Sequence, residues 1–563
     1  MESVQHYINE GILYEPVIPE IRNWPIARLS QDRRNYLAAV MADAQQALRA
    51  KHPDNDQMAA LIERTMFQER IRMTEDPWKV DPTDERKFWS RVKKDLVRLE
   101  QEKEQKGLGE PYIHLLDGII DRFTHEIAGN FRPSSYHFAK RFLPFFFSTL
   151  LNASAGKTIK STVQHSVGLQ EKVHLLGETE AIRRLTKIGT VVLVPTHFSN
   201  VDSILIGWGL HALGLPAFIY GAGLNLYNTK VLAYFMNRLG AYKVDRRKKN
   251  PIYREVLNAY STEALTRGVH SLFFPGGTRS RSGAIENHLK LGLLGTAIEA
   301  QRRNFLGPNP QKIFVVPLVM SYHFVLEASS LINQHLKSTG QSQYYLANDE
   351  ASNYWTFLKF VWKTFSASSE IALSFGKPMD LFGNFVDEAG NSLDPQGRNI
   401  DISAYFRSRG EFRADAQRDA EYTRRLGDLI VDRYQIENRV FSSHLVAFVA
   451  FEWLKKNHSD FDLYGLLRLP EEERHIPVSA MLTSVERVLN ALQRLESQGK
   501  VHLASHLVND VPTILEHGVK NLGIYHPRRP LSFQDEQTLG TDSMNLLYYY
   551  HNRLEGYGLA KYV

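Results

Sequence analysis

The feature that most constrains the fold is an alternation of short apolar runs with helix-length segments between residues 190 and 321. The apolar runs, which predict strands, are Val191–Pro195, Pro216–Gly221, Ala241–Val244, His270–Pro275 and Ile313–Ser321. The intervening segments, which predict helices, are Ser203–Leu213, Lys230–Leu239, Tyr253–Thr266 and Leu291–Arg303. Such alternation is typical of an α/β fold, in which helices cover a mainly parallel or mixed sheet. Glu370–Phe375 predicts one more strand.

Helical regions flank this centre on both sides. Residues 1–135 are charged and helical in period, and residues 386–563 become mostly helical after a loop-rich start. A chain of 563 residues has room for several domains. We therefore expect a helical N-terminal region (1–135), a central α/β domain (136–385) and a mostly helical C-terminal region (386–563).

Phe138–Leu151 (FAKRFLPFFFSTLL) is rich in Phe, with two cations near its start. It is shorter than the roughly 20 residues that a helix needs to cross a bilayer. An interfacial helix fits, because Phe enters the acyl boundary while cations meet lipid phosphates. A buried packing helix, kinked at Pro144, fits equally.

Composition excludes some chemistries and leaves others open. The chain has no cysteine, so a thiolate nucleophile and a Cys-liganded metal are excluded. Its 21 histidines do not show metal-ligand spacing, and we expect no metal and no cofactor. The net charge of +6 suits anionic partners, such as phosphate esters, coenzyme A, nucleic acid or an acidic membrane surface, and does not choose among them.

A histidine and an aspartate follow the first strand of the α/β segment. His197 comes directly after Val191–Pro195, at the carboxyl end of a strand, where open α/β sheets place their sites. Asp202, five residues on, can reach back to one imidazole nitrogen and leave the other to draw a proton from a hydroxyl. The alternative is structural, with Asp202 as a helix N-cap and His197 as a loop residue.

Two cationic segments follow later strands. Pro275–Gly283 (PGGTRSRSG) joins two glycines, which permit close backbone approach, to Arg279 and Arg281, whose forked donors suit a phosphate. We favour anion binding there over a basic surface loop. The run Arg246–Lys249 follows Ala241–Val244, and such a run is often a solvated face. Val315–Tyr322, which contains a proline, is interpreted as a wall or edge of the pocket.

The order of these elements resembles the glycerolipid acyltransferases, and specifically the bacterial glycerol-3-phosphate acyltransferases. Four blocks of that family are matched in order, by His197–Asp202, Gly240–Arg247, Phe274–Gly283 and Val316–Tyr322. Two shorter segments, Gly221–Leu226 and Asn545–Asn552, also resemble those enzymes. The resemblance covers about residues 170–380, and a weaker similarity is present at the C-terminus.

The resemblance implies a function and a role for each site residue. The function is transfer of an acyl group from acyl-CoA or acyl carrier protein, as co-substrate, to glycerol 3-phosphate, which forms lysophosphatidate in phospholipid biosynthesis. His197, oriented by Asp202, is the general base. The candidate substrate-binding residues are Arg279, Arg281, Arg246, Ser280, Gly277 and Lys290.

Two departures from the pattern bear on the acceptor. The glutamate of the third block falls on Gly276. The second block reads Val244–Arg246 with Asp245 inside, which is closer to the lysophosphatidate acyltransferases than to the Arg-Arg of the glycerol-3-phosphate type. Lysophosphatidate is therefore the alternative acceptor. A lipid-surface binding protein that has lost its chemistry is the alternative of another class.

The expected partners follow from this interpretation. They are a glycerol phosphate acceptor, an acyl-CoA or acyl carrier protein and a membrane surface, with no nucleic acid, because no recognisable nucleic-acid-binding motif is present. The expected location is peripheral, on the cytoplasmic face of the inner or plasma membrane.

Overall fold

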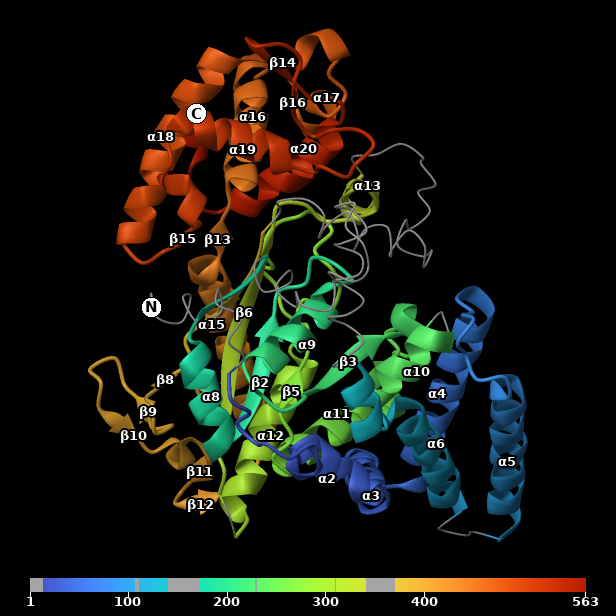
Figure 1. Ribbon diagram of the computed structural model, residues 1–563. Coiled ribbons are helices and arrows are strands. Elements are labelled where there is room, and N and C mark those ends of the chain that lie inside the picture. The colour runs from blue at the N-terminus through green and yellow to red at the C-terminus, as the bar shows by residue number, and fades with distance from the viewer. Residues whose placement is uncertain (1–13, 107–110, 140–171, 228–229, 309, 341–369) are drawn as a thin grey trace.

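A computed structural model describes residues 14–106, 111–139, 172–227, 230–308, 310–340 and 370–563. A seven-stranded sheet with strand order β1-β7-β6-β2-β5-β3-β4 lies at its centre (Figure 1). All neighbouring strands are parallel except β6 and β7, which are antiparallel, so the sheet is mixed. The expected α/β fold, with helices on the sheet and helical regions at its flanks, is confirmed.

Six of the sheet strands overlap the expected runs, although β3 begins three residues later than expected and β5 contains only two residues; β1 is the strand that the sequence pattern missed. Their bounds are Val173–Gly177 (β1), Thr190–Pro195 (β2), Ile219–Gly223 (β3), Ala241–Val244 (β4), Ser271–Leu272 (β5), Ile313–Tyr322 (β6) and Ile371–Phe375 (β7). Every residue of β2, β6 and β7 is buried, as a sheet covered on both faces requires.

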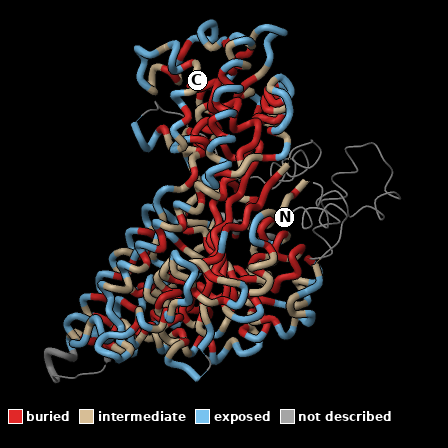
Figure 2. The backbone as a smooth tube through the Cα atoms, turned by 90° about the vertical axis from the view of Figure 1, so that its left-hand side faces the viewer, coloured by how far each residue is buried: buried red, intermediate tan, exposed pale blue. Residues whose placement is uncertain are grey.

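Helices cover both faces of the sheet, and alternate residues of β2 face each of them. Val191 and Leu193 join a core with α8 and α9, while Val192 and Val194 join another with α12 and α15. Figure 2 shows buried residues along the centre of the molecule and exposed residues on its outer surfaces. The helices of this part are α8 (Thr179–Ile188), α9 (Asp202–Ala212), α10 (Lys230–Arg238), α11 (Pro251–Thr266), α12 (Gly292–Leu306) and α13 (Ala328–Ser338).

The strand β6, expected as a wall or edge of the pocket, lies inside the sheet between β7 and β2. Its proline is tolerated because pairing with β7 stops there. The β6–β7 ladder ends at the pair Leu318↔Phe375, and Gly376 donates its backbone N–H to the carbonyl of Pro317 at 2.8 Å.

The N-terminal helices pack beside the β4 end of the sheet. They are α2 (Pro25–Gln31), α3 (Arg33–Lys51), α4 (Asn55–Glu75), α5 (Glu85–Lys106) and α6 (Pro111–Ile127). Helix α11 contacts α3, α4 and α6 from this group, and α12 on its other side. Buried side chains of α3, α6 and α11 form one apolar core, which ties this region to the sheet.

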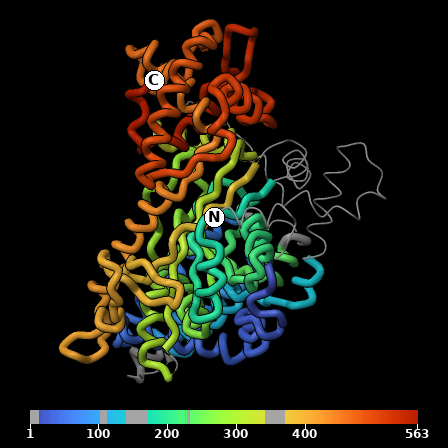
Figure 3. The backbone as a smooth tube through the Cα atoms, turned by 60° about the vertical axis from the view of Figure 1, so that its left-hand side comes forward, coloured from blue at the N-terminus to red at the C-terminus, as the bar shows by residue number. Residues whose placement is uncertain are grey.

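The C-terminal helices gather at the opposite end of the molecule, beyond α13 (Figures 1 and 3). They are α16 (Ser442–Asn457), α17 (Leu463–Leu466), α18 (Val478–Ser497), α19 (Val511–Asn521) and α20 (Met544–His551), and they follow α15 (Ala416–Glu437) in the chain. Helix α15 leads from the sheet to this group and packs against α12 and β6.

The C-terminal half also contains short strands that form small sheets apart from the central one. Two small sheets before α15 contain β8 (Phe385–Val386), β9 (Ser392–Leu393), β10 (Asn399–Ile400), β11 (Arg407–Ser408) and β12 (Glu411–Phe412). Two more join the C-terminal helices and contain β13 (Arg439–Val440), β14 (His475–Pro477), β15 (His502–Leu503), β16 (Ser532–Phe533) and β17 (Thr538–Gly540).

The Phe-rich segment Phe138–Leu151 lies outside the described residues except for its first two positions. Phe138 is 51% exposed and stacks on Phe235 of α10 with ring centroids 5.6 Å apart. Among the helices of the described residues, none has the length and apolarity to span a bilayer.

Candidate active site

His197 lies in the loop that joins β2 to α9, at the carboxyl edge of the five parallel strands. Its Nδ1 is 2.8 Å from Oδ2 of Asp202, the first residue of α9. The carboxylate of Asp202 is fully buried, whereas the side chain of His197 is 16% exposed. The ring of His197 stacks on Phe274 at a centroid distance of 4.1 Å. One imidazole nitrogen is thus fixed, and Nε2 is the one available to a substrate.

Asp202 does more than begin a helix. Val201 is the N-cap, and the carboxylate of Asp202 turns back over the loop, where Oδ2 accepts the backbone N–H groups of Phe198 (2.7 Å) and Ser199 (3.0 Å). Its other oxygen, Oδ1, accepts the hydroxyl of Tyr322 at the end of β6. These donors stabilise the ionised carboxylate, which can orient His197 and stabilise an imidazolium.

A pocket of about 230 Å³ opens beside His197. Residues from five parts of the chain form its wall: the His197 loop with the start of α9, the end of β3, the loop after β4, the Gly-Gly-Thr-Arg loop and α13. The lining residues are His197, Asn200, Ser203, Tyr220, Gly221, Ala222, Gly223, Arg246, Phe274, Thr278, Arg279, Arg281, Leu331 and Gln334. The structure therefore brings the histidine together with Arg246, Arg279 and Arg281.

Glu327 links the arginine loop to the histidine loop. Its Oε1 accepts Nη1 of Arg279 at 3.1 Å and the backbone N–H of Asn200 at 2.9 Å, while Oε2 accepts the hydroxyl of Ser199 at 2.8 Å. The side chain of Glu327 is 1% exposed. A buried carboxylate with these partners holds Arg279 at a fixed distance from the His197 loop.

The run Arg246–Lys249 is not one solvated face. Arg246 lines the pocket, where desolvation first, and the nearby charge of Arg279 second, lower its pKa from the ordinary value. Its neighbour Arg247 turns away, with Nε donating to Oδ1 of Asp245 at 2.9 Å. The Asp245 that departs from the second-block pattern therefore pairs with Arg247.

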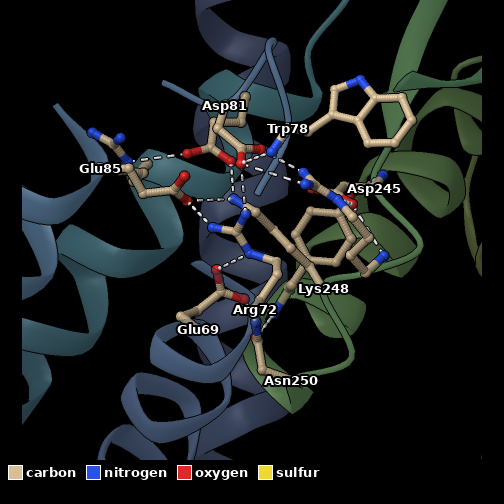
Figure 4. Close-up of polar contacts among 12 residues, drawn as sticks. Glu69, Arg72, Trp78, Asp81, Glu85, Asp245, Lys248 and Asn250 are labelled. Carbon is tan, nitrogen blue, oxygen red and sulfur yellow. Dashed lines mark hydrogen bonds and ion pairs between the residues drawn. The ribbon is translucent and has the colours of Figure 1, made fainter. Parts of the chain in front are cut away.

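A buried ion network anchors this segment to the N-terminal helices (Figure 4). Lys248 pairs with Glu85 at 3.3 Å and also with Glu126, and Arg72 pairs with Glu69 at 2.8 Å and with Glu85. Three more contacts extend the network: Arg247 Nη2 to Asp81 Oδ1 at 2.5 Å, Arg72 to Asp81 at 3.3 Å and Asn250 Nδ2 to Glu69 Oε1 at 2.8 Å. Arg247 and Lys248, the two residues that follow Arg246, are fixed by these ion pairs. The network therefore holds the loop that presents Arg246.

The remaining predicted binding residues shape the loop. Gly277 has φ +76°, and its N–H donates to the carbonyl of Phe274 at 3.0 Å. The hydroxyl of Ser280 donates to the carbonyl of Ala284 at 2.7 Å. The side chain of Lys290 packs so closely on Gly277 that a Cβ there would lie 2.5 Å from Cδ of Lys290. Within the described chain, none of the three is among the residues that line the pocket.

Several residues of the site escaped the sequence interpretation. Glu327 and the α13 residues Leu331 and Gln334 carry no recognisable motif. Tyr322 had a signal, because it ends a strand at the same edge of the sheet as His197. Glu286, ten residues after Gly276, accepts the backbone N–H of His197 at 2.7 Å, and burial raises the pKa of its carboxyl to about 7.

The C-terminal segment also reaches the site. Asn552 donates its side-chain N–H to the carbonyl of Ser282 at 2.9 Å, and Arg553 lies over the ring of Phe198 at 4.3 Å. Arg553 also donates to the carbonyl of Met320 at 2.6 Å and is 5% exposed. The segment Asn545–Asn552 thus contributes to the support behind the site.

In the described part of the chain, no group of three or more His, Asp or Glu side chains has the arrangement of a metal site. The chemistry that this geometry offers is general acid–base catalysis by a histidine, next to a cationic pocket for an anion.

Known proteins are similar to this chain over part of its length. Curated glycerol-3-phosphate acyltransferases of Pseudomonas fluorescens and Pseudomonas paraeruginosa are each 26% identical to this chain, over 268 and 266 residues. Each match covers 47% of this chain and 28% of the relative. Among solved structures, a 1-acyl-sn-glycerophosphate acyltransferase of Thermotoga maritima matches at 15% identity with a TM-score of 0.24, covering 53% of this chain and 92% of that one.

The family model named Acyltransferase matches residues 177–321. This range runs from the end of β1 to the penultimate residue of β6 and contains His197, Asp202 and the three pocket arginines. Over these residues the chain is therefore similar to the acyltransferase family.

Proposed function

We propose that this protein is a glycerol-3-phosphate O-acyltransferase that uses acyl-CoA or acyl carrier protein as donor and forms lysophosphatidate, a step of phospholipid biosynthesis. The observation that carries the proposal is the His197–Asp202 pair, whose fixed imidazole borders a pocket that also contains three arginines. The curated relatives bear the same activity in their names, over the part of the chain that matches.

The chemistry follows from the available nitrogen of His197. Nε2 accepts the proton of a glycerol hydroxyl while the hydroxyl oxygen attacks the thioester carbonyl carbon. The C–S bond then breaks, and His197 returns the proton to the leaving thiolate. No acyl group is attached to the protein, which is consistent with a chain that has no cysteine. Asp202 stabilises the imidazolium that forms between the two proton transfers.

The phosphate of the acceptor is assigned to the arginines of the pocket. Guanidinium groups bind phosphate oxygens with two parallel donors, and Arg246 and Arg281 approach the pocket from different loops. Arg279 is held by Glu327 and completes the cationic wall. Loss of one charged hydrogen bond costs roughly 1.5–3 kcal/mol, so removal of Arg281 should raise the acceptor KM by about 10- to 150-fold.

A transfer assay tests the proposal. Glycerol 3-phosphate and lysophosphatidate are each offered with acyl-CoA and with acyl carrier protein as donor. We expect transfer to glycerol 3-phosphate, its loss in His197→Ala, and a raised acceptor KM in Arg281→Ala. Lys249→Ala is the matched control, because Lys249 is exposed and is not a pocket-lining residue of the described chain.

Each other outcome of this assay has a meaning. Transfer to lysophosphatidate alone would replace the acceptor in the proposal, and transfer by His197→Ala at the wild-type rate would refute the mechanism. A wild-type protein that transfers nothing but binds vesicles would support the alternative of a lipid-surface binding protein.

We also propose that the protein acts at a membrane surface, peripherally and on the cytoplasmic face. An acylated product partitions into lipid, and Phe138, which begins the Phe-rich segment, is 51% exposed. Flotation with vesicles of anionic lipid tests this. Replacement of Phe145, Phe146 and Phe147 with Ser should abolish flotation, and unchanged flotation would contradict the proposal.

A further inference from the structure

Glu286 places a carboxylate where the third sequence block lacks one. Position 276 is glycine, where the resembling pattern has glutamate. A Cβ at Gly276 would lie 2.9 Å from Cγ and 3.2 Å from Oε1 of Glu286. The side chain of Glu286 therefore fills the space next to Gly276 that a side chain from position 276 would enter.

The carboxylate of Glu286 holds the backbone of the catalytic histidine. Its Oε1 accepts the N–H of His197 at 2.7 Å, and the N–H of Ser280 donates to the carbonyl of His197 at 2.7 Å. Both backbone groups of His197 are thus bound by one segment, residues 280–286. Because the side chain of His197 leaves from this fixed backbone, the two contacts set where its ring stands beside the pocket.

The second oxygen of Glu286 makes packing alone a poor explanation for this residue. Oε2 is buried and has no hydrogen-bond partner among the described residues. Burial of an oxygen without a partner carries a free-energy cost that an apolar side chain of similar size would avoid. Residues with such an unfavourable feature occur typically at functional sites.

We propose that Glu286 is the positioning residue of His197 and that this chain has moved the carboxylate of the third block from position 276 to position 286. The inference rests on the proposed function, because it assigns to Glu286 the alignment of the general base. Glu286 does not line the pocket in the described chain, so it acts through His197.

Three variants separate the acceptor oxygen from the volume of the side chain. Glu286→Met keeps the volume and removes the acceptor, and we expect kcat to fall by on the order of 10²-fold with little change in the acceptor KM, the scale of a displaced catalytic group. Glu286→Gln keeps an acceptor oxygen and should stay within a few-fold of the wild-type kcat. Glu286→Ala should resemble the Met variant.

Relocation of the carboxylate gives the sharpest test. In Glu286→Ala the atoms next to the Cβ position of residue 276 are removed, which makes room for a side chain there. The kcat of the double variant Gly276→Glu, Glu286→Ala should therefore be at least about tenfold higher than that of Glu286→Ala. Gly276→Glu alone places two carboxylates in one space and should lower both the melting temperature and kcat. A wild-type kcat in Glu286→Met, or no recovery in the double variant at an unchanged melting temperature, would overturn the proposal.

A second measurement keeps this test separate from the identity of the substrate. Diethyl pyrocarbonate modifies accessible imidazoles, and peptide mass spectrometry reports its rate at His197. We expect a changed rate at His197 in Glu286→Met and the wild-type rate in Glu286→Gln, with exposed His288 as the internal reference. An unchanged rate in the Met variant would refute the positioning role, even if the acceptor proved to be another molecule.

Discussion

The hydroxyl of Tyr322 donates a hydrogen bond to Oδ1 of Asp202, across 120 residues of sequence. Oδ2 of the same carboxylate accepts His197 and two backbone N–H groups. Asp202 is fully buried, so its charge depends on these donors in place of water. The end of β6 therefore contributes directly to the pair on which the proposed chemistry depends.

Tyr322→Phe removes one donor from a buried carboxylate. We expect the free energy of unfolding to fall by about 1.5–3 kcal/mol, the value of a hydrogen bond to a charged group, and kcat to fall with it. Thermal melting and steady-state kinetics measure both. Tyr549→Phe is the matched control, because the buried hydroxyl of Tyr549 has no hydrogen-bond partner within the described chain. Equal losses in the two variants would show that the contact with Asp202 contributes nothing specific.

The His197–Asp202 pair could be predicted from the sequence because it is local. The two residues are five positions apart, and the strand before them is a clear apolar run. The partners that complete the site are not local. Glu286 and Glu327 contact the His197 loop from 89 and 128 residues away, and no spacing rule connects carboxylates at such distances.

The cationic run after β4 shows a second limit. In the sequence its four cations are equivalent, and they are typical of a solvated face. The structure separates them, because Asp81, Glu85 and Glu126 of the N-terminal region bind Arg247 and Lys248, and Arg246 is left to the pocket. Which cation finds a carboxylate depends on how the N-terminal helices pack on the sheet, which periodicity alone does not determine.

Glu85→Gln tests the buried ion network. The side chains of Glu85, Arg72 and Lys248 are at most 4% exposed, so loss of the Glu85 charge leaves two buried cations undercompensated. Removal of one partner from a buried pair costs about 3–5 kcal/mol. We expect the free energy of unfolding, measured with urea, to fall by this amount. We also expect a raised acceptor KM, because the network holds the loop of Arg246.

Asp84→Asn is the control for the neighbouring position. Asp84 pairs with Arg122 through two hydrogen bonds of 2.9 Å, but its side chain is 62% exposed. Exposed pairs add little to stability because water screens them, so this variant should stay near the wild type in both measurements. A Glu85→Gln protein as stable as Asp84→Asn would contradict a structural role for the network.

Buried neutral histidines should make the fold sensitive to acid. Burial lowers the pKa of His270 from its ordinary value to about 3, and its Nδ1 accepts the backbone N–H of Val191 at 3.1 Å. Because the unfolded chain binds a proton more readily than the folded one, the stability is fully present above about pH 6.5 and is lost as the pH falls toward 3. His270→Asn retains an acceptor for Val191 and removes this titration.

Urea unfolding at pH 6.5, 5.5 and 4.5 measures the effect. We expect His270→Asn to reduce the pH slope of the unfolding free energy by up to about 1.4 kcal/mol per pH unit, the value of one proton. His288→Asn controls for an imidazole that is exposed to water in the folded state. A wild-type slope in His270→Asn would show that other groups govern acid unfolding.

Gly283 tests the contact between the arginine loop and the C-terminal segment. Its φ is +85°, and a Cβ there would lie 2.1 Å from the backbone carbonyl oxygen of Tyr549 in α20. No rotamer relieves a clash between a Cβ and a backbone atom, so Gly283→Ala must separate the loop from α20. Gly397→Ala is the matched control, because Gly397 has φ +79° and, apart from its chain neighbours, no described residue has a heavy atom within 4 Å of its Cβ position. In the control, stability should fall only by the cost of a left-handed backbone conformation, about 1–2 kcal/mol.

We expect Gly283→Ala to lower the stability measured by thermal melting by more than the control does. We also expect it to raise the acceptor KM, since Arg281 belongs to the displaced loop. Equal losses in the two variants would mean that the contact between Gly283 and α20 does not hold the arginine loop in place.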